Sequence, residues 1–316
     1  MSNPSTPPPN GTGGGQDPQR NVVESPNAGS ATSIRISSTF HFNANLDHVA
    51  PNTLILTPDR VLFVVHYHWL SAHSMNLFSG LLTDISNPTP DNLFVISVSE
   101  RADVLNILLH AVYGLSCHNY APTFQCLEET IEIFVKYGLT PIHHYVPDGS
   151  PIFNALLCHA PAKPIEVFAL AASYRLEDLA VSSSSYTLNL NIYHISCETA
   201  HKIGSQYLQR LYSLHEVRMV TLKELLNIQP TIPPHRDTST ARHSVPAEDH
   251  TQIVVRAYHL AAVQVFYTAS PAMSRARIES VMSRLINAIT CVCCKSSLIG
   301  HVEDISERWS LVSRTI

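Results

Sequence analysis

The sequence contains few charged residues. Only 14% of its 316 residues are Asp, Glu, Lys or Arg, against about 25% in an ordinary globular protein. The 20 basic residues form no dense run and are outnumbered by 25 acidic ones, which gives a net charge of −5. Because nucleic-acid binding depends mainly on Lys and Arg that neutralise phosphates, we expect no direct contact with DNA or RNA.

Long hydrophobic runs are missing as well. Apolar residues make up 45% of the chain, yet no uninterrupted apolar stretch reaches the roughly 18 residues typical of a membrane-spanning helix. The N-terminus has no cationic segment followed by an apolar one, so we expect no secretory leader. The seven cysteines are then expected to be reduced thiols of an intracellular protein, in the cytoplasm or the nucleus.

The sequence also lacks the motifs that carry catalysis. The triple glycine at 13–15 is followed by no Lys-Ser or Lys-Thr pair, so it is not a phosphate-binding loop. No G-x-S-x-G motif and no paired-carboxylate motif is present. His66 has no recognisable catalytic motif beside it, which favours a packed structural histidine. We therefore expect a protein that is not an enzyme and that has no cofactor.

Composition divides the chain into five parts. Residues 1–36, rich in Pro, Gly, Ser and Asn, are predicted to be a disordered tail, because they hold too little apolar surface to offset the entropy lost on ordering. Residues 37–146 are predicted to form a small α+β domain, and residues 147–229 a helical extension. A polar, proline-containing linker at 230–250 precedes a C-terminal helical segment at 251–316.

The predicted elements of the first domain alternate between strand and helix. Two β-rich runs, at 53–56 and 61–65, surround the turn Pro58-Asp59-Arg60 and predict a hairpin. A helical stretch is predicted from Trp69 to Leu82, and a third strand at 93–98. The domain is thus predicted to be a small sheet flanked by helices.

Most of the remaining periodicity is helical. Apolar residues at helical spacing predict helices at 103–113, 127–137, 201–212 and 217–228. Ser99 is predicted to be the N-cap of the first of them. A last helical segment, 253–312, is predicted to be interrupted at Pro271 and around Cys294.

The stretch from Asn52 to Leu82 resembles a BTB/POZ domain. Its hairpin ends in Phe63-Val64-Val65-His66, which matches the F-x-x-H of that family, and Leu70, Ser74, Leu77 and Leu81 follow at helical offsets. Further on, Val112-Tyr113 matches the aliphatic–Tyr pair that ends a helix in the family. The helical continuation and the tail 307–312 look like the BTB proteins of mushroom-forming fungi. The resemblance implies an adaptor or scaffold that works through protein–protein contacts.

Several positions depart from the family pattern. Asn52 and Thr53 stand where an aspartate and an aliphatic residue are usual, and Leu77 stands where an aromatic residue is usual. The segment 37–51 is too short and too irregular for the long first helix that makes swapped dimers in animal members. The partners that the resemblance implies are a second copy of the chain or a cullin of a ubiquitin ligase. A scaffold in transcriptional control is the other outcome within the family.

The predicted contact surface lies on the helix that follows the hairpin. Tyr67, His68, Ser71 and Ser74 are predicted to occupy its outer face or rim. Tyrosine and histidine are large, carry polar tips and suit interfaces that hold few charges. We expect Tyr67 in particular to contribute to a protein contact and not to folding.

The C-terminal cysteines suggest an alternative function. Cys291 and Cys294 have C-x-x-C spacing, and His301 lies nearby in the sequence. Structural zinc normally needs four ligands in two spaced pairs, and no second pair follows. We therefore expect packed thiols and no bound metal. A small zinc-dependent or redox regulator that uses these cysteines is the alternative to an adaptor.

Overall fold

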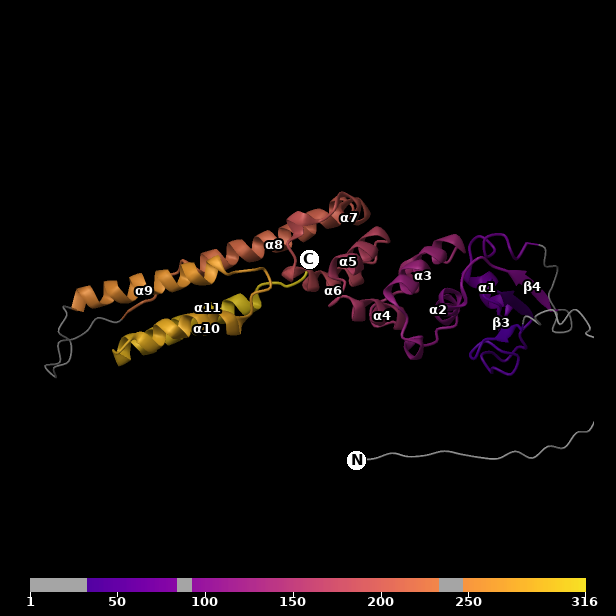
Figure 1. Cartoon of the computed structure of the whole chain (residues 1–316), viewed down its shortest axis with the longest axis horizontal. Helices are drawn as coiled ribbons and strands as arrows, with labels where there is room; N and C mark the ends of the chain where they lie inside the picture. The colour runs from indigo at the N-terminus through magenta and orange to yellow at the C-terminus, as the bar shows by residue number, and fades with distance from the viewer. Residues whose placement is uncertain (1–32, 84–92, 233–246) are drawn as a thin grey trace, which may run out of the picture.

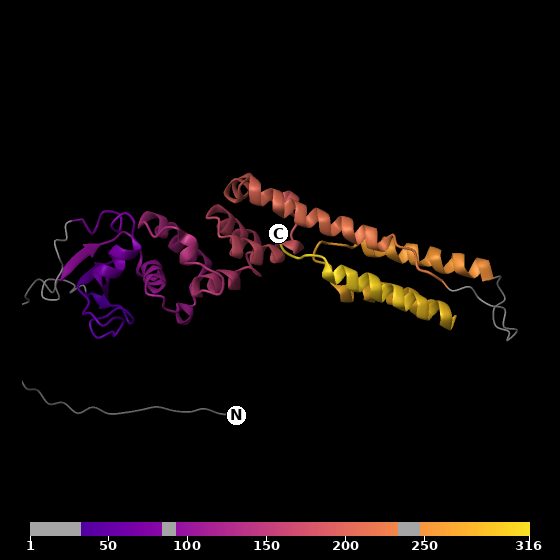
Figure 2. The ribbon, with the colours of Figure 1, turned by 180° about the vertical axis from the view of Figure 1, so that it is seen from behind.

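The computed structural model describes residues 33–83, 93–232 and 247–316. A small sheet lies at one end, a bundle of long helices lies at the other, and shorter helices lie between them (Figure 1). Figure 2 shows the same elongated arrangement from behind. Among the described residues, no helix is both long enough and apolar enough to cross a membrane. A small sheet with mostly helical surroundings agrees with the predicted α+β class.

The sheet contains the predicted hairpin. Within the described residues its strands are β1 (Arg35–Ile36), β2 (Thr53–Leu56), β3 (Val61–Val65) and β4 (Phe94–Ser97), in the order β1-β3-β2-β4. β2 and β3 pair antiparallel, whereas β1 pairs parallel with β3 and β4 pairs parallel with β2. The tail predicted at 1–36 is therefore too long, because residues 35 and 36 form a strand. Residues 1–32 of that tail lie outside the described residues.

The helix after the hairpin is shorter than predicted. α1 spans Tyr67–His73, and the chain leaves the helix at Ser74. Residues 77–79 have positive φ angles, so the helix predicted up to Leu82 is wrong. The Ser74 hydroxyl accepts a hydrogen bond from the backbone N–H of Phe78 at 2.6 Å and donates one to the carbonyl of Tyr137 at 2.6 Å. These two bonds end α1 and hold the following turn against Tyr137, at the C-terminal end of the helix Phe124–Lys136.

Two longer helices come next in the chain. α2 (Ala102–Val112) and α3 (Phe124–Lys136) pack against each other. The N-cap of α2 is Arg101, whose side chain makes no capping bond. The carboxylate of Asp59, in the β2–β3 turn, instead accepts from the Ala102 N–H at 3.1 and 3.3 Å. The predicted cap at Ser99 is therefore wrong, because the cap comes from the hairpin.

Short helices extend the same core away from the sheet. They are η1 (His118–Tyr120), η2 (Ile142–His144), α4 (Pro151–His159), α5 (Pro164–Ser173), α6 (Glu177–Ser184), η3 (Ser185–Asn189), η4 (Ile192–His194) and α7 (Cys197–Ile203). A continuous hydrophobic core runs from Phe40 to Leu211. The predicted domain at 37–146 and the extension that follows it thus share this core.

α8 (Ser205–Leu226) joins this core to a second one. It is one continuous helix where two were predicted, at 201–212 and 217–228. Its first half packs into the first core next to α7, at the end away from the sheet, and its second half contributes three leucines to a separate core. These leucines are Leu222, Leu225 and Leu226. One helix therefore links the predicted extension to the C-terminal segment.

The second core lies between α8 and three further helices. They are α9 (Ala247–Tyr267), α10 (Arg275–Ala288) and α11 (Val292–Leu311). The interruption predicted at Pro271 lies between α9 and α10, but the next one falls at 289–291, so Cys294 lies inside the first turn of α11. The linker predicted at 230–250 ends earlier, because α9 begins at Ala247. Its residues 233–246 lie outside the described ranges.

A buried arginine on α8 ties this bundle together. Arg218 is 1% exposed. Its Nε donates to the carbonyl of Pro271 at 2.6 Å, and its Nη1 donates to the carbonyls of Val312 and Ser313 at 2.7 Å each. The guanidinium also lies 4.3 Å from the ring centroid of Trp309. Burial lowers the pKa of Arg218 to about 10, so it remains charged at neutral pH.

We predict that Arg218→Ala destabilises the bundle by roughly 3 kcal/mol or more. Three carbonyl oxygens lose a charged donor, and each such loss costs about 1–3 kcal/mol. Urea unfolding of the full chain measures the effect. Arg210→Ala is the matched control on the same helix, because its ion pair with Glu177 is partly exposed and should contribute under about 1 kcal/mol. Equal losses in the two variants would contradict this assignment.

A second prediction concerns acid stability. His215, on α8, is 5% exposed, and burial together with the charge of Arg218 lowers its pKa to about 4. An unfolded histidine has a pKa of about 6.5. Between these values the unfolded chain binds a proton that the folded chain does not, so stability falls as the pH is lowered. We expect a loss of up to about 3 kcal/mol, seen as a falling urea midpoint, and a shallower fall in His215→Gln. An unchanged slope in that variant would show that other groups are responsible.

Candidate functional site

The predicted contact surface on α1 is partly open to solvent. His68 is exposed, and Tyr67 and Ser71 are partly buried. Ser74 is only 7% exposed, and its hydroxyl is engaged by the two bonds that end α1. Its placement on the outer face is wrong, because the chain folds over it instead of continuing as a helix. We call Tyr67, His68 and Ser71 the α1 patch.

A buried carboxylate fixes the histidine of this patch. Oδ2 of Asp47 accepts from Nε1 of Trp69 at 2.7 Å and lies 2.8 Å from Nε2 of His68. The hydrogen bond from Trp69 is the largest cause that holds the pKa of Asp47 well below its usual range. The Asp47 side chain is 6% exposed, whereas that of His68 is 51% exposed. The buried carboxylate of Asp47 therefore fixes the orientation of the exposed imidazole of His68.

His66 lies beneath the patch as a fully bonded structural histidine. Its Nε2 is 2.9 Å from the carbonyl of Val49, and its Nδ1 is 2.9 Å from the hydroxyl of Tyr113. A carbonyl can only accept, so we assign the proton to Nε2, and Nδ1 accepts from the Tyr113 hydroxyl. That hydroxyl accepts in turn from the backbone N–H of His66 at 2.8 Å. Burial lowers the pKa of His66, which keeps the ring neutral.

The other signature residues support the same region. Phe63 and Leu70 are 2% and 1% exposed, and Leu81 is partly buried against the core. The ring of Tyr113 stacks on Trp69, with centroids 5.2 Å apart. Trp69 stacks in turn on His73, at 5.5 Å. The side chains under the α1 patch are thus locked by packing, so the patch can act as a rigid contact surface.

A second exposed surface lies on α9 and was missed in the sequence. Ile253, Leu260, Val263 and Tyr267 are 55%, 73%, 65% and 89% exposed. Together with exposed Arg256 they follow a spacing of three and four residues, so they lie along one side of the helix. We call these five residues the α9 stripe. The buried residues of α9 have similar helical spacing, so periodicity alone could not tell which face is exposed.

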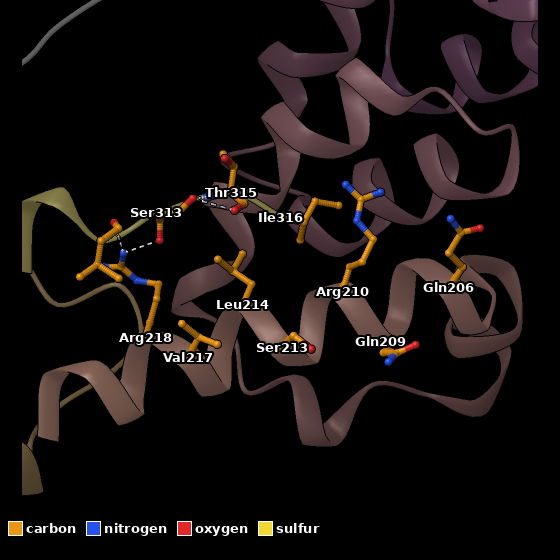
Figure 3. Close-up of a pocket in the computed structure, with 11 residues that line it drawn as sticks. Gln206, Gln209, Arg210, Ser213, Leu214, Val217, Arg218, Ser313, Thr315 and Ile316 are labelled. Carbon is orange, nitrogen blue, oxygen red and sulfur yellow. Dashed lines mark hydrogen bonds between the residues drawn. The ribbon is translucent and has the colours of Figure 1, made fainter. Parts of the chain in front are cut away.

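A cavity of about 490 Å³ lies where α8 meets the end of the chain (Figure 3). It is lined by Gln206, Gln209, Arg210, Ser213, Leu214, Val217, Arg218, Val312, Ser313, Thr315 and Ile316. Both of its arginines are engaged, Arg210 by Glu177 and Arg218 by backbone carbonyls. The other described side chains of the lining are uncharged. The cavity therefore presents apolar side chains and amides, and no converging set of catalytic groups.

The C-terminal cysteines come together without the predicted histidine. The sulfurs of Cys291, Cys293 and Cys294 all lie within 4.8 Å of one another. His301 lies about two turns further along α11, where its Nε2 is 3.0 Å from the carbonyl of Ile228. The sequence pointed to Cys291, Cys294 and His301 as candidate ligands. In the structure, His301 lies away from the two cysteines, and Cys293 lies beside them instead. The helical start at Val292 brings Cys293 into the group.

We predict different outcomes for two neighbouring truncations on α1. Leu70→Ala should lower the free energy of unfolding by roughly 2–5 kcal/mol, because Leu70 is a core residue. Tyr67→Ala should cost clearly less, because Tyr67 is partly exposed, but should weaken self-association or partner binding. Urea unfolding and sedimentation measure the two effects. If Tyr67→Ala unfolds the domain as badly as Leu70→Ala, Tyr67 belongs to the core.

Comparison of the chain with protein-family models, with curated proteins and with solved structures finds no match. The BTB/POZ resemblance therefore rests on the residues of this chain alone.

Proposed function

We propose that this chain is a protein-interaction adaptor with two contact surfaces, the α1 patch and the α9 stripe. One observation carries the proposal: two bodies with separate hydrophobic cores are joined by α8, and each body exposes side chains suited to protein contacts. Exposed apolar groups that gather on one surface commonly mark interaction sites. An adaptor needs two such surfaces on one chain.

The α9 stripe favours a helical partner. Its residues have the spacing of a coiled-coil seam, on which a second amphipathic helix can pack. Arg256 lies within the seam, so the matching helix should carry a carboxylate opposite it. The partner that we propose for this surface is therefore an amphipathic helix of another protein with an acidic residue in its apolar face.

The α1 patch is the surface to which the BTB/POZ resemblance applies. The hairpin, the order of the following elements and the His66–Tyr113 contact support that resemblance. Within the family, the partner of such a domain is a second copy or a cullin of a ubiquitin ligase, and another outcome is a scaffold in transcriptional control. The proposed role is thus a substrate adaptor or a scaffold. A small zinc-dependent or redox regulator that uses the C-terminal cysteines remains the alternative, and the close approach of Cys291, Cys293 and Cys294 supports it.

The test compares partner capture by the full chain with capture by surface variants. Val263→Glu alters the α9 stripe, and Val135→Glu, at a valine that is 50% exposed on α3, is the matched control. We expect Val263→Glu to weaken capture of the helical partner by roughly tenfold or more, a loss of about 1.4 kcal/mol, with an unchanged melting temperature. Tyr67→Ala should weaken binding of a second copy or of a purified cullin.

Two outcomes would contradict the proposal that the chain is an adaptor. Capture that survives both Val263→Glu and Tyr67→Ala would show that neither surface is used. An equal loss in Val135→Glu would show that an added charge acts non-specifically.

A further inference from the structure

The three clustered cysteines occupy the start of α11. Cys291 is the N-cap residue of that helix, and Cys293 and Cys294 lie in its first turn. All three sulfurs lie within 4.8 Å of one another, and those of Cys291 and Cys293 are 2.9 Å apart. With metal–sulfur distances of about 2.3 Å, three sulfurs around one ion lie about 4 Å apart. Small side-chain rotations therefore suffice to place one ion between them.

The surroundings of the cluster are apolar on one side and open on the other. Cys294 is 0% exposed and Cys291 is 5% exposed. Val254 of α9, Ile232 and Ile289 pack against these two residues. Cys293 is exposed. An ion can thus enter past Cys293 and be held against an apolar wall that limits access of water.

Metal binding to the cluster should depend on pH. Thiols must lose their protons to bind a metal ion, so an ion that binds all three sulfurs should release protons and bind more weakly at low pH.

The chemistry of the donors selects the ion. Among the described residues, the cluster consists of three cysteines, with no histidine or carboxylate. Thiolates select soft ions such as Cu(I) and Zn(II), and structural zinc is almost always four-coordinate. Three sulfurs, which are the donors that the described part of the chain supplies, suit a soft ion that accepts three ligands. We propose that Cys291, Cys293 and Cys294 form a three-thiolate site for Cu(I) at the end of the helical bundle.

This site lies beside one end of the α9 stripe. Val254, which packs on the cluster, is adjacent in sequence to Ile253 of the stripe. All three proposed ligands belong to the start of α11, so a bound ion would fix these side chains next to α9 without a bond to it. Metal binding itself is independent of the adaptor proposal and is tested without a partner.

The test is a Cu(I) titration of the reduced full chain, without oxygen, against a chromogenic Cu(I) chelator. We expect one Cu(I) per chain, three sulfur neighbours in X-ray absorption, and a higher melting temperature with the metal than without it. Cys293→Ser should lose stoichiometric binding and this thermal shift, and because Cys293 is exposed the variant should still fold. Cys158→Ser and Cys197→Ser, at exposed cysteines elsewhere, are the matched controls and should bind as the unaltered chain does.

Three results would overturn the proposal. One is binding in Cys293→Ser equal to that of the controls. Another is a nitrogen or oxygen neighbour of the ion together with tighter binding of Zn(II) than of Cu(I), which would indicate a four-ligand zinc site. The third is failure to bind Cu(I); a disulfide between Cys291 and Cys293, found by peptide mapping after exposure to a small-molecule disulfide, would then indicate a redox pair.

Discussion

The buried guanidinium of Arg218 is the interaction on which the helical bundle of α8 to α11 depends. It is held by backbone carbonyls, which cannot change their charge, and by the face of Trp309. These contacts connect α8 to the loop before α10 and to the end of α11. Because the first half of α8 also packs into the first core, one continuous helix belongs to both bodies. A buried charge is costly unless it is hydrogen-bonded, so loss of these carbonyl contacts would leave the guanidinium uncompensated.

The proposed contact surfaces obtain their rigidity in different ways. The α1 patch depends on polar groups beneath it, since Asp47 orients His68 while His66 and Tyr113 bond to each other. The α9 stripe depends on the bundle core, which holds the opposite face of the helix. The cysteine cluster lies where α11 starts and packs against α9. One surface is thus maintained by hydrogen bonds, and the other by packing.

Local sequence patterns were sufficient to predict several elements of the fold. The hairpin around Asp59 followed from two β-rich runs and a turn, and α2 and α3 followed from their apolar spacing. The break at Pro271 followed from the chemistry of proline. The burial of Phe63 and Leu70 followed from the same patterns. These features depend on neighbours within a few residues, so the sequence contains the information that determines them.

Only tertiary contacts decided the rest. Ser74 ends α1 because Tyr137, 63 residues later, accepts its hydrogen bond, and the cap of α2 comes from Asp59, 43 residues earlier. The cysteine cluster includes Cys293 and excludes His301 because of where α11 begins and what His301 contacts. The sequence by itself determined the class of the fold, its hairpin and most of its helices, because these follow from local periodicity. The tertiary structure decided helix ends, exposed faces and the cysteine group, because these depend on partners that are distant along the chain.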